Sequence, residues 1–242
     1  RLEWMRSMLN WLNDTHNVSV QFQDETTPHY VNITKSNQII KEELVQTKQI
    51  SYPNLEIGEY KMTLHSYGYE KEVFEFIMQT GDSISIHSYP KRSKTFPVNL
   101  HFENSQNNLI YTQLFFYQHL LSEDILDQNS LSLDLPTGSY MIKAVSAEME
   151  PIVYKWTITD EPVEKDLAFA EKKKKVLLIN DSLTGDYFLD NYLRLGDFYQ
   201  KYFTSVSLGV DFWNVSLLGF PKKLDVLPYK VVYYFLVSIR ML

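Results

Sequence analysis

The chain has 242 residues, of which 44% are hydrophobic and 22% are charged, and its formal net charge is -7. This is the composition of a globular protein, and so acidic a chain has no overall basic surface for nucleic acid. The absence of cysteine excludes disulfides, thiolate metal sites and a cysteine nucleophile.

The N-terminal residues 1–16 are expected to form a helix, because their large apolar residues recur at helical spacing. These residues are Trp4, Met5, Met8, Leu9 and Leu12. The segment has no apolar core of signal-peptide length. No run in the sequence reaches the roughly 18–20 apolar residues that span a bilayer, so no membrane span is expected. Because the chain begins with Arg1, we expect it to be a piece of a longer protein.

An internal repeat appears when the sequence is shifted by 80 residues. It predicts two like modules, at residues 17–90 and 91–165. Matching positions include Val18, Val20, Phe22, Leu55, Gly58 and Tyr60 on Val98, Leu100, Phe102, Leu135, Gly138 and Tyr140. The middle of the repeat, residues 35–50 against 115–130, matches poorly and is expected to differ in its loops.

Each module is predicted to be a β-sandwich. Its segments alternate apolar and polar residues, which is typical of strands with one buried face. Gly58 and Gly138 open paired strands at turns expected to need positive φ, and Tyr60 and Tyr140 follow as core anchors. Short links between antiparallel strands favour a small Greek-key sandwich of about seven strands.

The repeat also resembles a known kind of module. The segments LEIGEY at 55–60 and LPTGSY at 135–140, with a Gly-Tyr-Glu turn at 68–70, are similar to carboxypeptidase-regulatory-like, transthyretin-like sandwiches. The second module has Glu-Met-Glu at 148–150 in place of that turn. The resemblance implies a spacer or accessory module of a secreted or surface enzyme.

After residue 160 the pattern changes. Charged residues at 161–175 suggest a linker, and the four lysines that end it are expected to be solvated. A buried parallel strand is predicted at 176–179 and a helix at 187–203. Further strands are predicted at 210–213 and 231–235, joined by a polar crossover at 221–229. This order indicates the first part of a doubly wound α/β domain spanning 172–242.

Several short motifs in this last part resemble one family. They are Asn-Asp at 180–181, Asp-Phe-Trp-Asn-Val at 211–215, Gly-Phe-Pro at 219–221 and Leu-Pro-Tyr at 227–229. Similar segments follow the catalytic domain of bacillopeptidase F-like subtilisins and accompany immune inhibitor A-like metalloproteases. The resemblance implies a flavodoxin-like or amidotransferase-like α/β segment that brings no catalytic residue.

About 70 residues follow residue 172, whereas a complete doubly wound domain needs about 130. The expectation is therefore a truncated or frame-shifted α/β segment. Its last strand would leave an open sheet edge, through which two copies could dimerise.

Candidate catalytic chemistry is sparse. The six histidines form no HExxH pair, and His65 is expected to be a solvated or hydrogen-bonded sandwich residue. Asp181 and Asp186 flank a strand end and are weak candidate calcium ligands, because carboxylates that cap the next helix are the favoured explanation. Ser182 is the only candidate nucleophile near that strand end. No catalytic or cofactor-binding residue is predicted.

Three functions are compatible with these features. The first is a non-catalytic accessory or spacer fragment of a secreted or cell-surface bacterial subtilisin-like protease, whose partner would be that protease domain or a surface polymer. The second is a cell-surface module that binds carbohydrate or protein, suggested by the 17 tyrosines, although core packing also explains them. The third is a cryptic enzyme in the α/β part.

Overall fold

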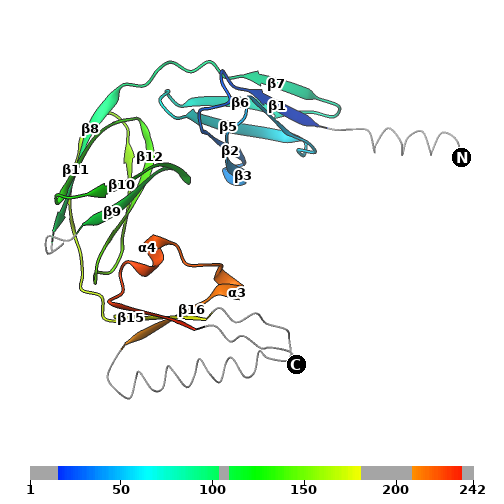
Figure 1. Ribbon diagram of the computed structural model, residues 1–242. Coiled ribbons are helices and arrows are strands. Elements are labelled where there is room, and N and C mark those ends of the chain that lie inside the picture. Colours follow the sequence, from blue (N-terminus) through cyan, green and yellow to red (C-terminus); the bar gives the residue numbers. More distant parts are fainter. Residues whose placement is uncertain (1–15, 104–108, 181–208, 236–242) are drawn as a thin grey trace, which may run out of the picture.

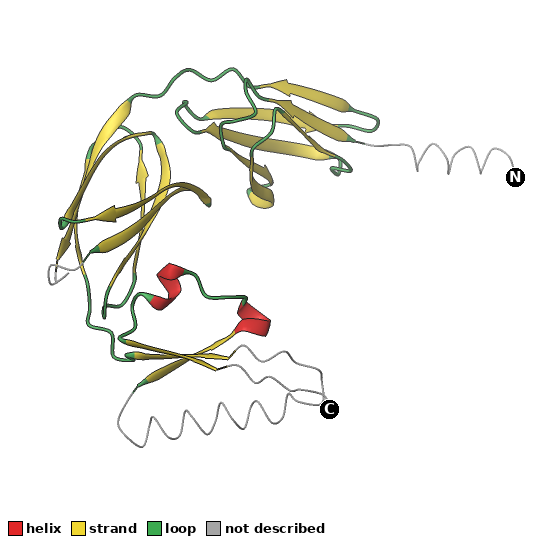
Figure 2. Cartoon of the chain, in the orientation of Figure 1, coloured by secondary structure: helices red, strands yellow, loops and turns green. Residues whose placement is uncertain are grey.

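The computed structural model describes residues 16–103, 109–180 and 209–235. The fold is mainly β, as the sequence predicts: two tandem β-sandwiches precede a small parallel sheet with two short helices (Figures 1 and 2). The predicted N-terminal helix lies outside the described residues.

The first sandwich contains seven strands in two sheets, ordered β4-β1-β7 and β3-β2-β5-β6. The chain changes sheet between β1 and β2 and again between β3 and β4, as in Greek-key connections. The strands are β1 (Asn17–Gln21), β2 (His29–Lys35), β3 (Gln38–Val45), β4 (Gln49–Tyr52), β5 (Gly58–Ser66), β6 (Glu72–Met78) and β7 (Ser83–His87).

The second sandwich repeats this topology strand for strand, with sheets β11-β8-β14 and β10-β9-β12-β13. In both sandwiches the first strand pairs antiparallel with the fourth and parallel with the seventh. The strands are β8 (Thr95–Glu103), β9 (Ile110–Phe116), β10 (His119–Leu126), β11 (Ser130–Pro136), β12 (Gly138–Ser146), β13 (Ile152–Ile158) and β14 (Val163–Ala168).

The strand register explains why the middle of the repeat matches poorly in sequence. Val31 pairs with Leu64 in the first sandwich, and Thr112 pairs with Ala144 in the second. The offset is therefore 80 between β5 and β12 but 81 between β2 and β9. The second sandwich has one additional residue before β9. A fixed shift of 80 therefore misaligns the middle strands by one residue, although these strands correspond in the structure.

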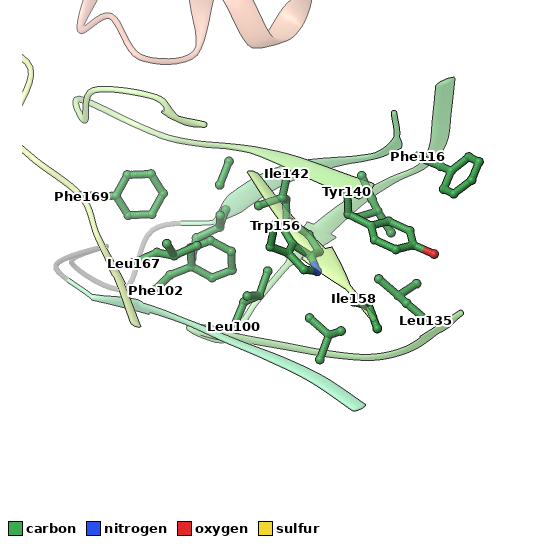
Figure 3. Close-up of a cluster of buried hydrophobic side chains, with 14 of the residues drawn as sticks. Leu100, Phe102, Phe116, Leu135, Tyr140, Ile142, Trp156, Ile158, Leu167 and Phe169 are labelled. Carbon is green, nitrogen blue, oxygen red and sulfur yellow. The ribbon is translucent and has the colours of Figure 1, made fainter. Parts of the chain in front are cut away.

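Each sandwich has its own hydrophobic core. In the second, Phe116 and Tyr140 lie at one end of the cluster and Phe169 lies at the other (Figure 3). Tyr60 and Tyr140 are buried as predicted, and each donates a hydrogen bond to a carbonyl four residues earlier, at 2.8 and 2.9 Å respectively. The aromatic rings therefore anchor the core while their hydroxyls stay bonded.

The turns before these tyrosines have the predicted backbone. Gly58 has φ +146° and Gly138 has φ +153°, which residues with a Cβ rarely adopt. A Cβ at Gly138 would lie 2.6 Å from the ring of buried Phe116. Both glycines are therefore required by the backbone, and the second also by close packing.

The linker predicted over residues 161–175 is wrong for residues 163–168. These form β14, which pairs with β8, and Leu167 and Phe169 enter the core. The segment has the charge pattern of a linker because β14 is a sheet-edge strand with few inward residues. The second sandwich thus runs past residue 165.

The last described part is a parallel sheet ordered β16-β15-β17, as predicted for an α/β segment. Its strands are β15 (Val176–Asn180), β16 (Val210–Asn214) and β17 (Val231–Phe235). Short helices α3 (Val215–Leu218) and α4 (Lys223–Val226) connect the last two, so the predicted polar crossover contains one helical turn. The predicted helix at 187–203 lies outside the described residues.

Candidate functional site

The strongest structural feature beyond the cores is the way each sandwich holds the segment that follows it. At the first junction, a turn closes with the Tyr69 N–H bonded to the Ser66 carbonyl, and Gly68 has φ +84°. The linker then docks on this turn, because the N–H of Glu70 donates to the Lys91 carbonyl and the N–H of Ser93 to the Gly68 carbonyl. These bonds, 2.8 and 3.0 Å long, fix the path of the linker.

The second junction uses the same bonds. Glu148 takes the place of Gly68 with φ +60°, so the turn whose sequence departs from the motif keeps its geometry. The N–H of Glu150 donates to the Ala170 carbonyl at 2.8 Å, and the N–H of Lys172 donates to the Glu148 carbonyl at 2.9 Å. A repeated docking of linker on turn sets the direction in which each following segment starts.

Side chains complete the first junction. The ring of Tyr30 on β2 stacks on that of Tyr117, in the β9–β10 turn, with centroids 3.8 Å apart and planes 3° from parallel. The His65 Nδ1 atom and the Tyr117 hydroxyl share a hydrogen bond of 3.1 Å. Leu44 and Tyr67 pack against the core of the second sandwich. We call Tyr30, Leu44, His65 and Tyr67, with Glu42, the docking face.

His65 is buried, not solvated, although its position in β5 is out of phase with the core residues. Leu64 and Ser66 face the interior of the first sandwich, whereas His65 faces outward and is buried because the second sandwich covers it there. This burial lowers the pKa of His65, so the neutral ring is favoured. The prediction of a hydrogen-bonded sandwich histidine is correct, but its partner belongs to the other module.

A second buried histidine is internal to the first sandwich. His29 stacks on Phe22 with centroids 3.9 Å apart, and its Nε2 donates to the Asp24 carbonyl at 3.0 Å. Its Nδ1 therefore accepts from the Ser66 hydroxyl at 2.7 Å, since a neutral ring donates from only one nitrogen. Burial lowers the pKa of His29, in agreement with a neutral structural role.

A pocket of about 450 Å³ opens beside the Tyr30–Tyr117 stack, between the two sandwiches. The hydroxyl of Tyr30 donates to Glu42 at 2.8 Å on one side of it. The part that belongs to the second sandwich we call the receiving face; it consists of Tyr117, Gln118, Ser139, Tyr140, Met141, Lys155, Trp156 and Thr157. Aromatic rings next to charged groups make this the candidate binding pocket of the described residues.

The second junction uses the counterparts of the docking face. Tyr111, which corresponds to Tyr30, lies under the Lys223 ammonium of α4 at 5.1 Å from the ring centroid. Ile125, which corresponds to Leu44, lines a hollow with Lys223 and Leu227. The same surface of each sandwich therefore contacts the next part of the chain.

Lys172 is buried at this junction, so the prediction of four solvated lysines is wrong for it. Its ammonium lies 3.4 Å from the carboxylates of both Glu150 and Asp211 and 4.5 Å from the ring centroid of Tyr229. Although burial alone would raise the pKa of Asp211, hydrogen bonds from Lys174 and Tyr229 hold it below its ordinary value. A charged cluster thus links the second sandwich to the parallel sheet.

The motifs that resemble protease-accessory segments contact one another. The Tyr229 hydroxyl donates to Asp211 at 2.6 Å, and the Trp213 indole donates to the Gly219 carbonyl at 2.7 Å. These residues support local structure, and no described one forms a catalytic pair.

The predicted metal candidates Asp181 and Asp186, and the candidate nucleophile Ser182, lie outside the described residues. Within the described ranges, no group of three or more histidine or acidic side chains could hold a metal ion. No helix in the same ranges is long and apolar enough to cross a membrane. The junctions were not predicted, although Tyr30 and Tyr111 would have aligned at a shift of 81 instead of 80.

No protein-family model matches the chain, and no curated protein matches its sequence. Solved structures with partial likeness include the Bacillus anthracis TIE protein, with 12% identity and a TM-score of 0.29 over 69% of this chain and 36% of that one. A streptococcal ancillary pilin has 10% identity and a TM-score of 0.31 over 67% of this chain and 64% of that one. GBS52, the minor pilin of Streptococcus agalactiae, has 12% identity and a TM-score of 0.32 over 64% and 96%.

The chain thus spans about a third of the length of the first of these proteins and just under two thirds of the second. The tandem sandwich fold of this chain is assigned from its own strand pairing.

Proposed function

We propose that the chain is a non-catalytic spacer array of a secreted or cell-surface bacterial protein, whose modules are held in a fixed mutual orientation. The observation that carries the proposal is the repeated docking of linker on turn, through the Glu70–Lys91 and Glu150–Ala170 backbone bonds, both 2.8 Å long. Paired backbone bonds and stacked rings restrict the hinge that an exposed linker would otherwise provide. The array is divided into modules at residues 17–90, 91–170 and 172–242.

The parent protein in this proposal is a bacillopeptidase F-like protease, in which the array follows a catalytic domain. The basis for this parent is the order of the motifs at 180–181, 211–215, 219–221 and 227–229, of which three contact one another through Asp211 with Tyr229 and Trp213 with Gly219. Neutral His29 and His65 have structural roles: the Ser66 hydroxyl that bonds to His29 is buried with it, and His65 bonds to Tyr117 across the junction.

Small-angle X-ray scattering of the full chain tests the spacer role. We expect the curve of one fixed arrangement, and we expect Ser93→Pro, which removes the N–H bonded to Gly68, to broaden the distance distribution. Lys94→Pro is the matched control, because no hydrogen bond of the Lys94 N–H is among those of the described residues. A flexible profile for the unmodified chain, or turnover of casein or ester substrates by it, would overturn the proposal.

A second candidate function is ligand binding in the pocket between the sandwiches. Aromatic rings beside Glu42 and Lys155 are suited to a sugar whose ring stacks and whose hydroxyls donate to Glu42 and accept from Lys155. A glycan array probed with the full chain, and with Lys155→Ala as the binding-deficient variant, separates the two functions. If no glycan on the array binds the chain, the sugar-binding function is excluded and the spacer role remains.

A further inference from the structure

The first sandwich carries its own copy of the receiving face. The eight residues that form this face in the second sandwich correspond, at offsets of 80 or 81, to residues of the first that line a hollow of about 650 Å³. Ser36 corresponds to Tyr117, and Glu75 corresponds to Lys155. In the described part of the chain, this hollow is lined by the first sandwich alone. Among the residues that the structure describes, one receiving face is therefore occupied and the other is not.

The exposure of the two faces agrees with this difference. Ser139 and Met141 are half-buried in the second sandwich, whereas their counterparts Glu59 and Lys61 are exposed. Ile77, which lines the first face, is 58% exposed. A large exposed apolar side chain at a hollow agrees with a surface that another protein covers.

The kind of partner follows from the occupied face. There the occupant is the docking face of a β-sandwich, which brings the Tyr30 ring onto the β9–β10 turn and places Leu44 against the core behind it. The first sandwich presents the equivalent β2–β3 turn, with Ser36 at φ +50° and Asn37 at φ +63°. A partner with the same strands would fit the same geometry.

The charges differ, and they select the partner. Lys155 faces a docking face that carries Glu42, but its counterpart in the first sandwich is Glu75. Ser139 is replaced by Glu59 and Met141 by Lys61, so the first face has two carboxylates and one ammonium and is acidic on balance. A second copy of this chain would oppose carboxylates to carboxylates, and its own docking face is already covered by its second sandwich. The matching partner is therefore basic at the position of Glu42.

We propose that the first sandwich docks a further β-sandwich module, which places an aromatic ring on the Ser36–Asn37 turn and basic side chains opposite Glu59 and Glu75. This inference goes beyond the spacer role, because it names a binding surface and the chemistry of its partner. It holds whether the partner module is in the same polypeptide or in another protein.

The test uses a lengthened chain in which a copy of residues 15–94 is inserted between Asp14 and Thr15. This insertion preserves the linker, because Lys94 of the copy is then followed by Thr15 as it is by Thr95 in the natural chain. In one version the copy keeps Glu42, and in the other it carries Glu42→Lys. The chain has no natural cysteine, so an introduced pair gives a clean cross-linking signal.

The reporting pair is Glu43→Cys in the copy and Asn37→Cys in the first sandwich, joined by a short bis-maleimide, which leaves the Tyr30 ring in place. The control pair, Glu43→Cys with Gln118→Cys in the unlengthened chain, joins two residues that line the same pocket and marks the yield of a docked junction. We expect the lysine version to reach a yield similar to the control and the glutamate version to be at least about tenfold lower, which corresponds to about 1.4 kcal/mol. The converse exchange, Glu59→Ser with Glu75→Lys beneath a glutamate-bearing copy, should restore the yield.

Low yield in both the lysine version and the converse exchange, with an intact control, would overturn the docking surface. Equal yields for lysine and glutamate versions would overturn the basic partner. Scattering from the unmodified chain reports only the existing junctions, so failure of the spacer role is distinguishable from failure of this inference.

Discussion

The ring of Tyr30 lies flat on the ring of Tyr117, 3.8 Å between centroids, although the two residues belong to different sandwiches. Between them the chain runs through five further strands of the first sandwich, the linker and two strands of the second. Their contact joins the two sandwiches, whose cores are separate, and fixes the orientation of one relative to the other. It is the clearest reason to treat the junction, rather than either sandwich, as the functional unit.

Removal of either ring should weaken the junction. Stacked aromatic pairs contribute about 0.5–1.5 kcal/mol beyond their buried area, so a double-mutant cycle of Tyr30→Ala and Tyr117→Ala should show a coupling energy in that range. Urea unfolding of the four chains measures it. Tyr89→Ala, at a side chain that is 69% exposed, should combine additively with Tyr117→Ala. A coupling near zero for Tyr30 and Tyr117 would show that the stack does not stabilise the protein.

Glu148→Gly should stabilise the second sandwich. Glu148 has φ +60° at the position where the first sandwich has Gly68, and a residue with a Cβ is strained there by about 1 kcal/mol. The lost ion pair with Lys175, 3.9 Å away at the surface, contributes little. Thermal unfolding should show a higher midpoint. Ala147→Gly, one residue earlier in the turn and without positive φ, should instead lower it.

Gly138→Ala should cost more stability than Gly58→Ala. Both residues have positive φ, but the new Cβ would meet the ring of buried Phe116 at 2.6 Å in one case and the flexible end of Lys35 at 2.8 Å in the other. A lysine side chain can move aside, whereas a core ring cannot without strain. We expect a difference of about 1–2 kcal/mol in the free energy of unfolding. Equal losses would mean that backbone strain alone decides the cost.

Acid should weaken the first junction. Burial lowers the pKa of His65 in the folded chain, and the unfolded value is about 6.5. The stabilisation by neutral His65 is therefore complete above about pH 6.5 and is lost as the pH falls below it, at up to about 1.4 kcal/mol per pH unit. His65→Gln should reduce the slope of unfolding free energy between about pH 6.5 and 5. His101→Gln, at an exposed side chain, should leave this slope unchanged.

Lys172→Met should loosen the parallel sheet from the second sandwich. The methionine keeps the chain length beside Tyr229 but removes the ion pairs with Glu150 and Asp211. We expect a loss of about 1–2 kcal/mol, measured as faster amide hydrogen exchange in β15. Lys173→Met, at the exposed neighbouring residue, is the control. Unchanged exchange in β15 would show that backbone docking alone holds the sheet.

The sequence by itself determined the repeat, the first strand of each sandwich, the paired strands that follow Gly58 and Gly138, and the three parallel strands of the last part. These features depend on the alternation of apolar and polar residues and on turn residues within a short segment, so they can be predicted without knowledge of the tertiary contacts. The offset between corresponding residues of the two sandwiches changes from 80 to 81 before β9, and a sequence comparison at one fixed offset does not detect this change.

Only the tertiary structure decided which outer faces are buried. Val145 and His65 occupy corresponding positions, and both are buried although they point away from the sandwich cores, because a following module covers them. The sequence likewise predicts a solvated Lys172. In the structure its ammonium is buried between Glu150 and Asp211, which belong to two different modules. Burial of the outward face of a strand depends on contacts between segments far apart in the chain. Local sequence patterns do not predict those contacts.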